Sequence, residues 1–283
     1  MARASSSTFA QVGKGTASAA LRSPWMERLA RIGYAARGIV YAIVGLLAVQ
    51  AALGARSRPT DTRGALQAVA AQSRPLLWLL AVGLFGYALW RIVQGLLDRE
   101  NKGSGAKGLA QRAGRVFTGL IYGGLGLAAV RIAQGAHGAS VSGGQGYREW
   151  TAKLMSEPFG RWLVAAVGIG VIAGGLFQIW RGWAEKFRKE IRLQEMDATE
   201  KKLAIHAGKL GLIARGVVFL VSGWFLLQAA LRFDPSQARG LAGALAALAG
   251  QPHGAFLLGL VAVGLVAFGA YSLLLARYGR IVV

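Results

Sequence analysis

Six stretches of mostly apolar residues constrain the fold of this chain more than any other feature of its sequence. They run approximately over residues 33–53, 76–97, 114–134, 162–180, 212–231 and 255–276. Each is long enough to cross about 30 Å of hydrocarbon as an α-helix, which keeps its backbone hydrogen bonds internal. The charged fraction is only 16%, against about 25% in an average soluble protein. The sequence therefore predicts an all-α integral membrane protein with six transmembrane helices.

Lysine and arginine are distributed unequally between the two sides of these spans. Of the 33, with Arg115 counted as a flank of the third span, twenty lie before the first span, in or beside the second and fourth loops, or after the last span. Nine lie in the other three loops, and four lie within spans. Cytoplasmic segments are enriched in these residues. We therefore expect a multi-pass protein of the bacterial inner (cytoplasmic) membrane with both termini cytoplasmic.

The odd-numbered spans repeat one pattern three times. A glycine, an aromatic residue and a second glycine recur at spacings of three and four residues, which places them on one helix face. The three sets are Gly38, Tyr41 and Gly45; Gly119, Tyr122 and Gly126; and Gly216, Phe219 and Gly223. Small residues on one face let membrane helices pack closely, so we interpret this face as a helix-packing surface. A ligand groove lined by the three aromatic residues is the alternative.

The even-numbered spans repeat more weakly. Their matched sets are Gly83, Gly170 and Gly264; Ala88, Gly175 and Gly269; and Trp90, Phe177 and Tyr271. Each repeat holds two spans, so the three hairpins share one orientation and are expected to be related by a pseudo-threefold axis. The predicted organisation is a disordered cytoplasmic tail over 1–22 followed by repeats over 23–100, 109–187 and 197–280.

The segments between the spans also differ by side. The external loops contain helix-prone stretches at 62–72, 147–157 and 238–251, which we interpret as short interfacial helices. On the cytoplasmic side, residues 181–202 are predicted to be a charged helix extension. Within it, Asp197 is the expected N-cap of the next helix, with Glu200 at the third helical position.

The starts of the odd-numbered spans suggest a family. An Arg-x-Gly-x-x-x-Arg-Gly pattern occurs at 31–38, with related versions at 209–216 and 112–119. With this pattern in triplicate, the chain resembles the bacterial membrane proteins grouped as domain of unknown function 1206, over about residues 28 to 280. The resemblance implies three tandem two-helix units and no activity. The middle repeat departs from the pattern at Thr118, where the other two have Arg37 and Arg215.

Four arginines lie within the predicted spans and are the main candidate sites. Arg37, Arg91 and Arg215 lie near the cytoplasmic boundary, from which a long side chain can reach lipid headgroups. Hydrogen bonding between helices and a role in transport are the alternatives for these residues. Arg131 occupies, near the external side, the position held by two glutamines in the other repeats. The set of candidate polar intramembrane positions is Gln50, Arg131 and Gln228.

The sequence offers no constellation for chemistry. No Asp or Glu lies within a span, no nucleophile elbow or phosphate-binding loop is found, and the chain has no cysteine. We therefore expect no catalytic, cofactor-binding or metal-binding residues and no enzyme activity.

The leading functional hypothesis is a non-enzymatic membrane scaffold or accessory component. The alternative is a channel or carrier for a small solute or ion, or a lipid-binding protein, that uses the repeat interface around Gln50, Arg131 and Gln228. The expected partners are membrane lipids, with anionic headgroups on the cytoplasmic side. A protein partner is left open, and nucleic acid is not expected.

Overall fold

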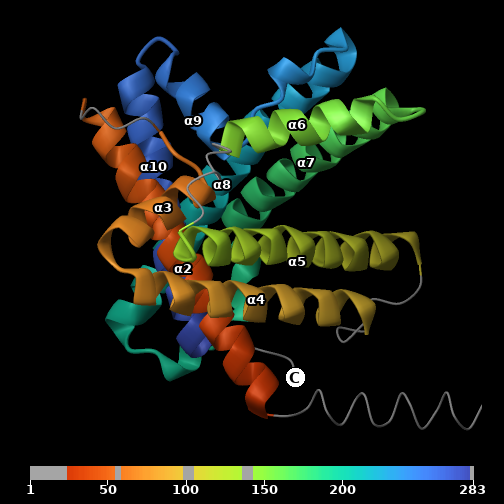
Figure 1. The fold of residues 1–283 in the computed structure, drawn as a ribbon. Helices are drawn as coiled ribbons and strands as arrows, with labels where there is room; N and C mark the ends of the chain where they lie inside the picture. The colour runs from red at the N-terminus through yellow and green to blue at the C-terminus, as the bar shows by residue number, and fades with distance from the viewer. Residues whose placement is uncertain (1–23, 55–58, 98–104, 136–142, 281–283) are drawn as a thin grey trace, which may run out of the picture.

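The computed structural model describes residues 24–54, 59–97, 105–135 and 143–280. The tail predicted over 1–22 lies outside these residues. Six long helices dominate the part of the chain that is described (Figure 1). They are α2 (Pro24–Ala52), α4 (Arg74–Leu96), α5 (Ala106–Ala133), α7 (Gly160–Trp183), α8 (Ala198–Arg232) and α10 (Gly254–Tyr278).

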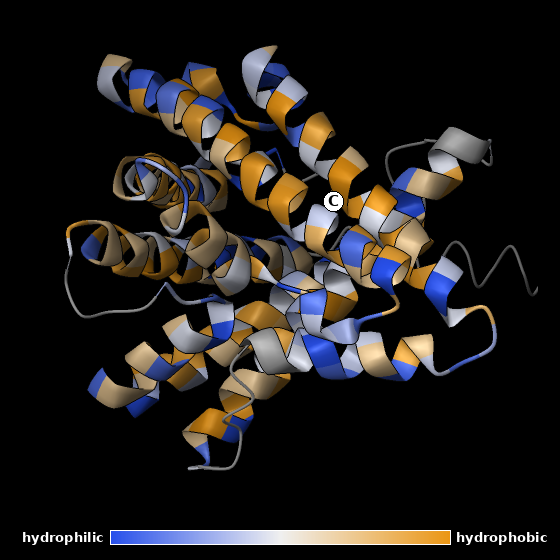
Figure 2. Cartoon of the chain, turned by 90° about the horizontal axis from the view of Figure 1, so that it is seen from above, coloured by the Kyte–Doolittle hydropathy of each residue, from blue (hydrophilic) through white to orange (hydrophobic). Residues whose placement is uncertain are grey.

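All six helices are long and apolar enough to cross a membrane, as predicted. Hydrophobic residues run along them (Figure 2), and many large apolar side chains point outward, among them Trp162, Leu120 and Phe256. Exposed apolar surface of this extent is unfavourable in water and is what lipid requires. The chain is therefore a multi-pass membrane protein.

In each repeat one short helix connects the two spans, which confirms the helices predicted in the three external loops. They are α3 (Thr62–Gln72), α6 (Gly143–Met155) and α9 (Leu241–Ala249). The start of α3 is fixed by Asp61, whose carboxylate accepts hydrogen bonds from the backbone N–H of Arg63 and Gly64 at 3.0 and 2.9 Å. Its apolar side, with Leu66 and Val69 buried, packs against the ends of the long helices.

The linker between α7 and α8 differs from its prediction. The expected charged helix extension is wrong, because Glu185 adopts a left-handed conformation (φ 52°) that ends α7. Two short 3-10 turns follow, η1 (Lys186–Glu190) and η2 (Leu193–Glu195). The predicted N-cap is confirmed, since Asp197 and Glu200 form a reciprocal capping box at the start of α8.

The long helices associate in three close pairs, and each pair joins two different repeats. An odd-numbered span packs against the even-numbered span of the preceding repeat, with the first repeat joined to the third. The pairs are α2 with α10, α5 with α4, and α8 with α7. The pairing runs once around the molecule, which is the arrangement expected of pseudo-threefold-related repeats.

The residues at these pair interfaces are the predicted small ones, taken from both sets of spans. Close backbone contacts join Gly38 with Gly269, Gly119 with Ala88, and Gly216 with Gly175. A Cβ atom added to the first residue of each couple would lie 2.8 to 2.9 Å from the carbonyl oxygen of the second. The Gly-aromatic-Gly face thus lies at the contact between two helices, and its partner belongs to the neighbouring repeat.

Candidate functional site

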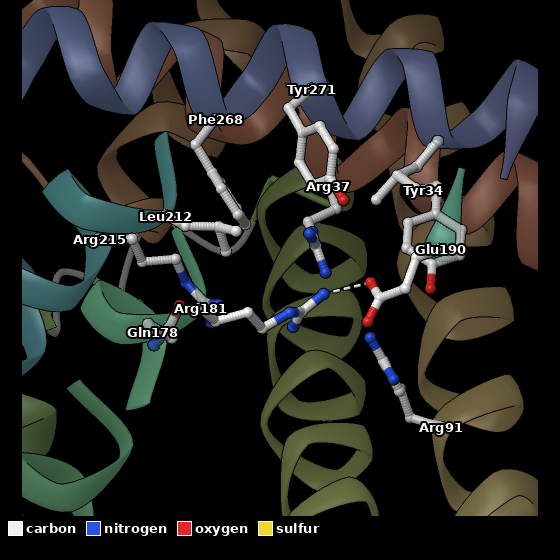
Figure 3. A pocket seen from close by; sticks show the side chains of 11 residues that line it. Tyr34, Arg37, Arg91, Gln178, Arg181, Glu190, Leu212, Arg215, Phe268 and Tyr271 are labelled. Carbon is white, nitrogen blue, oxygen red and sulfur yellow. Dashed lines mark hydrogen bonds and ion pairs between the residues drawn. The ribbon is translucent and has the colours of Figure 1, made fainter. Parts of the chain in front are cut away.

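A cavity of about 100 Å³ lies among α2, α4, α7, α8 and α10, next to η1. Four arginines reach into it from four different helices (Figure 3), namely Arg37, Arg91, Arg181 and Arg215. Of the lining residues that the structure describes, Glu190 of η1 is the one acid. Four guanidinium groups therefore face a single carboxylate, and we call this space the arginine cavity.

Arg37 is the most deeply placed of the four arginines. Its side chain on α2 is buried, with 6% exposure. Two of its nitrogens donate to the hydroxyl of Ser272 on α10 at 3.2 and 3.3 Å, and a third donates to the hydroxyl of Tyr87 on α4. The guanidinium also lies 4.7 Å from the ring centroid of Phe268, a distance typical of a cation–π contact.

Arg91 and Arg215 are partly buried and bind neutral acceptors as well. Arg91 on α4 donates to Tyr87 at 2.9 Å and to the amide oxygen of Gln94 at 3.1 Å. Arg215 on α8 donates to the hydroxyl of Tyr41 at 3.2 Å and to the amide oxygen of Gln178 at 2.9 Å. Each of these two arginines is therefore hydrogen-bonded to a tyrosine hydroxyl and to a glutamine amide oxygen.

These contacts correct the expectation that the three arginines extend outward to lipid headgroups. Arg37 cannot do so, because its side chain is enclosed by α2, α4 and α10. Arg91 and Arg215 turn toward the same cavity. The physical reason is that the bundle interior supplies hydroxyl, amide and aromatic groups in hydrogen-bonding or cation–π reach of each guanidinium. The alternative of hydrogen bonding between side chains of the bundle is confirmed for Arg37 and Arg215.

Arg37, Arg91 and Arg215 hold related positions in the three helix pairs, although Arg91 is on an even-numbered span and the other two are on odd-numbered spans. The alignment of the even-numbered spans matches Arg91 with Gln178 and Ser272, one residue beyond the aromatic set. Across two of the helix pairs this position is hydrogen-bonded to the arginine of the odd-numbered span, Arg37 to Ser272 and Arg215 to Gln178. In the pair α4 with α5 the arginine, Arg91, is on the even-numbered span, and the odd-numbered span has Thr118 at the position of Arg37 and Arg215. Each pair consequently contributes one arginine, although the odd-numbered pattern is broken in the middle repeat.

Glu190 reaches the arginine cavity from the linker that covers it. Its carboxylate forms an ion pair with Arg181, and Figure 3 shows Arg91 on its other side. Its carbonyl oxygen accepts a hydrogen bond from the backbone N–H of Arg280 at 2.8 Å. In the same turn, Phe187 is buried against the ring of Tyr271, with centroids 5.3 Å apart. The covering segment is therefore attached to the C-terminal end of α10.

The aromatic residues of the repeat pack beside the cavity. Tyr41 and Tyr122 are both buried. Their rings meet those of Phe268 and Tyr87 edge-on, at centroid distances of 4.8 and 4.7 Å. Phe219 lies against the guanidinium of Arg215, 4.6 Å from ring centroid to carbon. These contacts fit the packing interpretation of the face.

The second candidate set occupies a different place. Gln50 and Arg131 are exposed, and Gln228 is partly exposed. They lie near the other ends of α2, α5 and α8, and no hydrogen bond joins any two of them in the described part of the chain. The structure thus does not bring the three together as a polar ring, and the assignment of a solute path to them remains a prediction.

The arginine cavity has the chemistry of an anion site. Arg37, Arg91 and Arg215 make no ion pair with a carboxylate among the described residues, although all three are at least partly buried. A buried cation without a counter-charge is costly, and the planar guanidinium suits the oxygens of carboxylate and phosphate. An oxyanion bound there would offset this cost.

The fold and the cavity define the class: a six-helix membrane protein built from three interlocked hairpins around a basic centre. Three segments, 32–98, 113–185 and 210–279, match the family model described as Domain of Unknown Function (DUF1206). The chain belongs to this family. It is 35% identical over 257 residues to "Uncharacterized protein YxxB" of Bacillus subtilis (strain 168), covering 90% of this chain and 92% of that protein. No solved structure matches it.

Proposed function

We propose that this protein binds a phosphate-type oxyanion in the arginine cavity, as a non-enzymatic component of the bacterial inner membrane. The observation that carries the proposal is the convergence of four guanidinium groups on a space of about 100 Å³ with one carboxylate. A tetrahedral oxyanion presents several acceptor oxygens, and guanidinium groups donate to them in pairs. The cavity lining offers groups that can bind such an ion. A protein that binds an oxyanion there can also act as a membrane scaffold.

The proposed orientation places both termini and η1 in the cytoplasm. It rests on the excess of lysine and arginine in the tail, in the second and fourth connecting segments and at the C-terminus. The arginine cavity then lies toward the cytoplasmic side, below η1. A C-terminal alkaline phosphatase fusion is expected to be inactive in cells, and an active fusion would contradict the orientation.

Equilibrium dialysis of the detergent-purified protein with radiolabelled inorganic phosphate tests the binding. We expect Arg91→Gln and Arg215→Gln to weaken phosphate binding by about 10- to 100-fold, since a hydrogen bond to a charged group contributes about 1.5 to 3 kcal/mol. Arg131→Gln is the matched control, because Arg131 is exposed and does not line the cavity. The reverse pattern, in which Arg131→Gln abolishes binding and the cavity variants retain it, would refute the site and favour the set around Arg131.

A further inference from the structure

The middle repeat differs from the other two in how its own two helices meet. In the first repeat, a Cβ atom added at Gly33 of α2 would lie 2.7 Å from Tyr87 of α4. In the third repeat, one added at Gly211 of α8 would lie 2.5 Å from Phe268 of α10. At Gly114 of α5, the equivalent position in the middle repeat, nothing lies within 4 Å. The two helices of this repeat, α5 and α7, run apart in Figure 1 and make little contact.

The sequence contains a physical reason for this separation. Gly83 and Gly264 of the even-numbered spans lie directly against Ala36 and Ala214. A Cβ atom added at either glycine would overlap the Cβ atom of that alanine. The equivalent of these two alanines in the middle repeat is Phe117, which is too large for such a contact and is 54% exposed. Its would-be partner is Gly170, where an added Cβ would also meet nothing within 4 Å. The bulk of Phe117 thus prevents α5 and α7 from closing as the other two hairpins do.

Solvent exposure at equivalent positions marks the walls of the opening. On the odd-numbered spans, Val40 and Val218 are 1% and 2% exposed, whereas Ile121 of α5 is 53% exposed. On the even-numbered spans, Trp90 and Tyr271 are each 1% exposed, whereas Phe177 of α7 is 53% exposed. The walls are apolar throughout. We call this opening the lateral gap, with Phe117, Ile121, Gly170, Gly174 and Phe177 as its walls.

The lateral gap and the arginine cavity share one face of α7, because Gly174 lies four and seven residues before Gln178 and Arg181, which line the cavity. Three helix pairs surround the centre, and the gap lies between the pair α4 with α5 and the pair α7 with α8. Arg91 comes from the first of these pairs, and Arg181 and Arg215 come from the second. A molecule that follows this face of α7 from the gap meets apolar residues first and then the cavity-lining residues Gln178 and Arg181.

We propose that the ligand of the arginine cavity is an anionic phospholipid that enters sideways from the bilayer through the lateral gap. This inference rests on the proposed oxyanion binding and names the molecule that carries the oxyanion. The phosphate group would lie among the four arginines, and the acyl chains would lie against Phe117, Ile121 and Phe177. A free phosphate ion would use the same arginines and would have no use for apolar walls at the depth of the hydrocarbon. The glycines Gly170 and Gly174 leave room for a chain to lie against α7.

Two substitutions fill the gap without touching the cavity lining. They are Gly174→Trp, where an added Cβ meets nothing within 4 Å, and Ile121→Trp, at an exposed position. The control is Leu176→Trp, because Leu176 is 55% exposed and lies about 160° around α7 from Gly174. The probes are phosphatidylglycerol and phosphatidylcholine with the same acyl chains, titrated by native mass spectrometry. Radiolabelled inorganic phosphate, measured by equilibrium dialysis, reports separately on the cavity and on folding.

The wild type is expected to bind phosphatidylglycerol at least tenfold more tightly than phosphatidylcholine. Each gap variant should lose at least tenfold in affinity for phosphatidylglycerol and keep the wild-type affinity for phosphate, and Leu176→Trp should keep both. If one gap variant fails to fold and binds no phosphate, the other decides. Retained lipid binding in a folded gap variant, or a wild type that binds phosphate but not phosphatidylglycerol, would overturn the lipid inference and leave oxyanion binding standing. A wild type that binds neither probe would overturn the proposed function itself.

Discussion

The three repeats allow one substitution to be made in three equivalent places with opposite expected effects. Gly83, Gly170 and Gly264 hold the same position in α4, α7 and α10. An alanine Cβ at Gly83 would lie 2.6 Å from the Cβ of Ala36, and at Gly264 it would approach Ala214 even more closely. At Gly170 it would meet nothing within 4 Å. The same chemical change therefore overfills two interfaces and leaves the third unaffected.

The magnitudes follow from two opposing effects on the free energy of unfolding. Replacing glycine by alanine inside a helix stabilises it by about 1 kcal/mol, and overpacking a close contact costs about 1 to 3 kcal/mol. Gly170→Ala should therefore raise stability by up to about 1 kcal/mol. Gly83→Ala and Gly264→Ala should each lower it by about 1 kcal/mol, after the helix-propensity gain is subtracted from the overpacking cost. The expected difference between the middle position and the other two is about 2 kcal/mol.

Unfolding in mixed micelles by increasing SDS, followed by the fluorescence of the eight tryptophans, would measure these differences. Wild-type protein and the three variants are compared at one protein concentration in one detergent. If the lateral gap exists, Gly170→Ala changes the free energy of unfolding in the opposite direction from Gly83→Ala and Gly264→Ala. Equal destabilisation at all three positions would refute the reasoning, because it would mean that α5 and α7 close in the folded protein as the other hairpins do.

Three further predictions concern the linker, a helix cap and a charged turn. Glu190→Gln should tighten phosphate binding in equilibrium dialysis by up to about tenfold, because it removes the carboxylate that competes for Arg181, and unchanged binding would show that Glu190 does not compete. Asp197→Ala should lower the free energy of unfolding by about 1 kcal/mol through loss of the capping box, whereas an equal loss from Asp197→Asn, which keeps a capping oxygen, would argue against that cause. Hydrogen bonds from Ser236 and Gln237 lower the pKa of Asp234, so its stabilising effect is present above the unfolded-state pKa and disappears as the pH falls through the lowered folded value. Asp234→Asn should accordingly lower the melting temperature at pH 7, and a difference that persists unchanged in strong acid would contradict this.

Much of the fold could be predicted from the sequence because the bilayer restricts the possible structures so strongly. Apolar length fixed the six helices, and the repeated glycines identified the contact face. The partner of that face could not be read from the pattern. Gly38 contacts Gly269 of the third repeat, a choice that depends on how three hairpins close around a centre. Spacing along one helix carries no information on which neighbour it will meet.

The candidate site was harder to predict because its residues come from unrelated parts of the chain. Arg37 and Arg215 are recognisable in the sequence as charges within spans. A position near a helix end suits contact with lipid as well as hydrogen bonding within the bundle. For Arg37, its burial and its hydrogen bonds to Ser272 decide for the bundle. Glu190 was missed because the charged linker was expected to be helical. No local signal marked the end of α7, because Ala184 and Glu185 both favour a helix, yet α7 ends at Trp183 and Glu185 adopts a left-handed conformation.

The break in symmetry at Thr118 connects the two features on which function is proposed. An arginine at position 118 would add a second guanidinium group to the pair α4 with α5, which already carries Arg91, and like charges in one site repel each other. With Thr118 in place, Arg37, Arg91 and Arg215 come one from each pair, and Arg181 of α7 is the fourth arginine of the cavity. One residue earlier, Phe117 replaces the alanine of the other two repeats, and α5 makes little contact with α7. Two neighbouring substitutions in one repeat thus leave the basic centre complete and open it on one side, which is the combination that a ligand with a charged head and apolar chains requires.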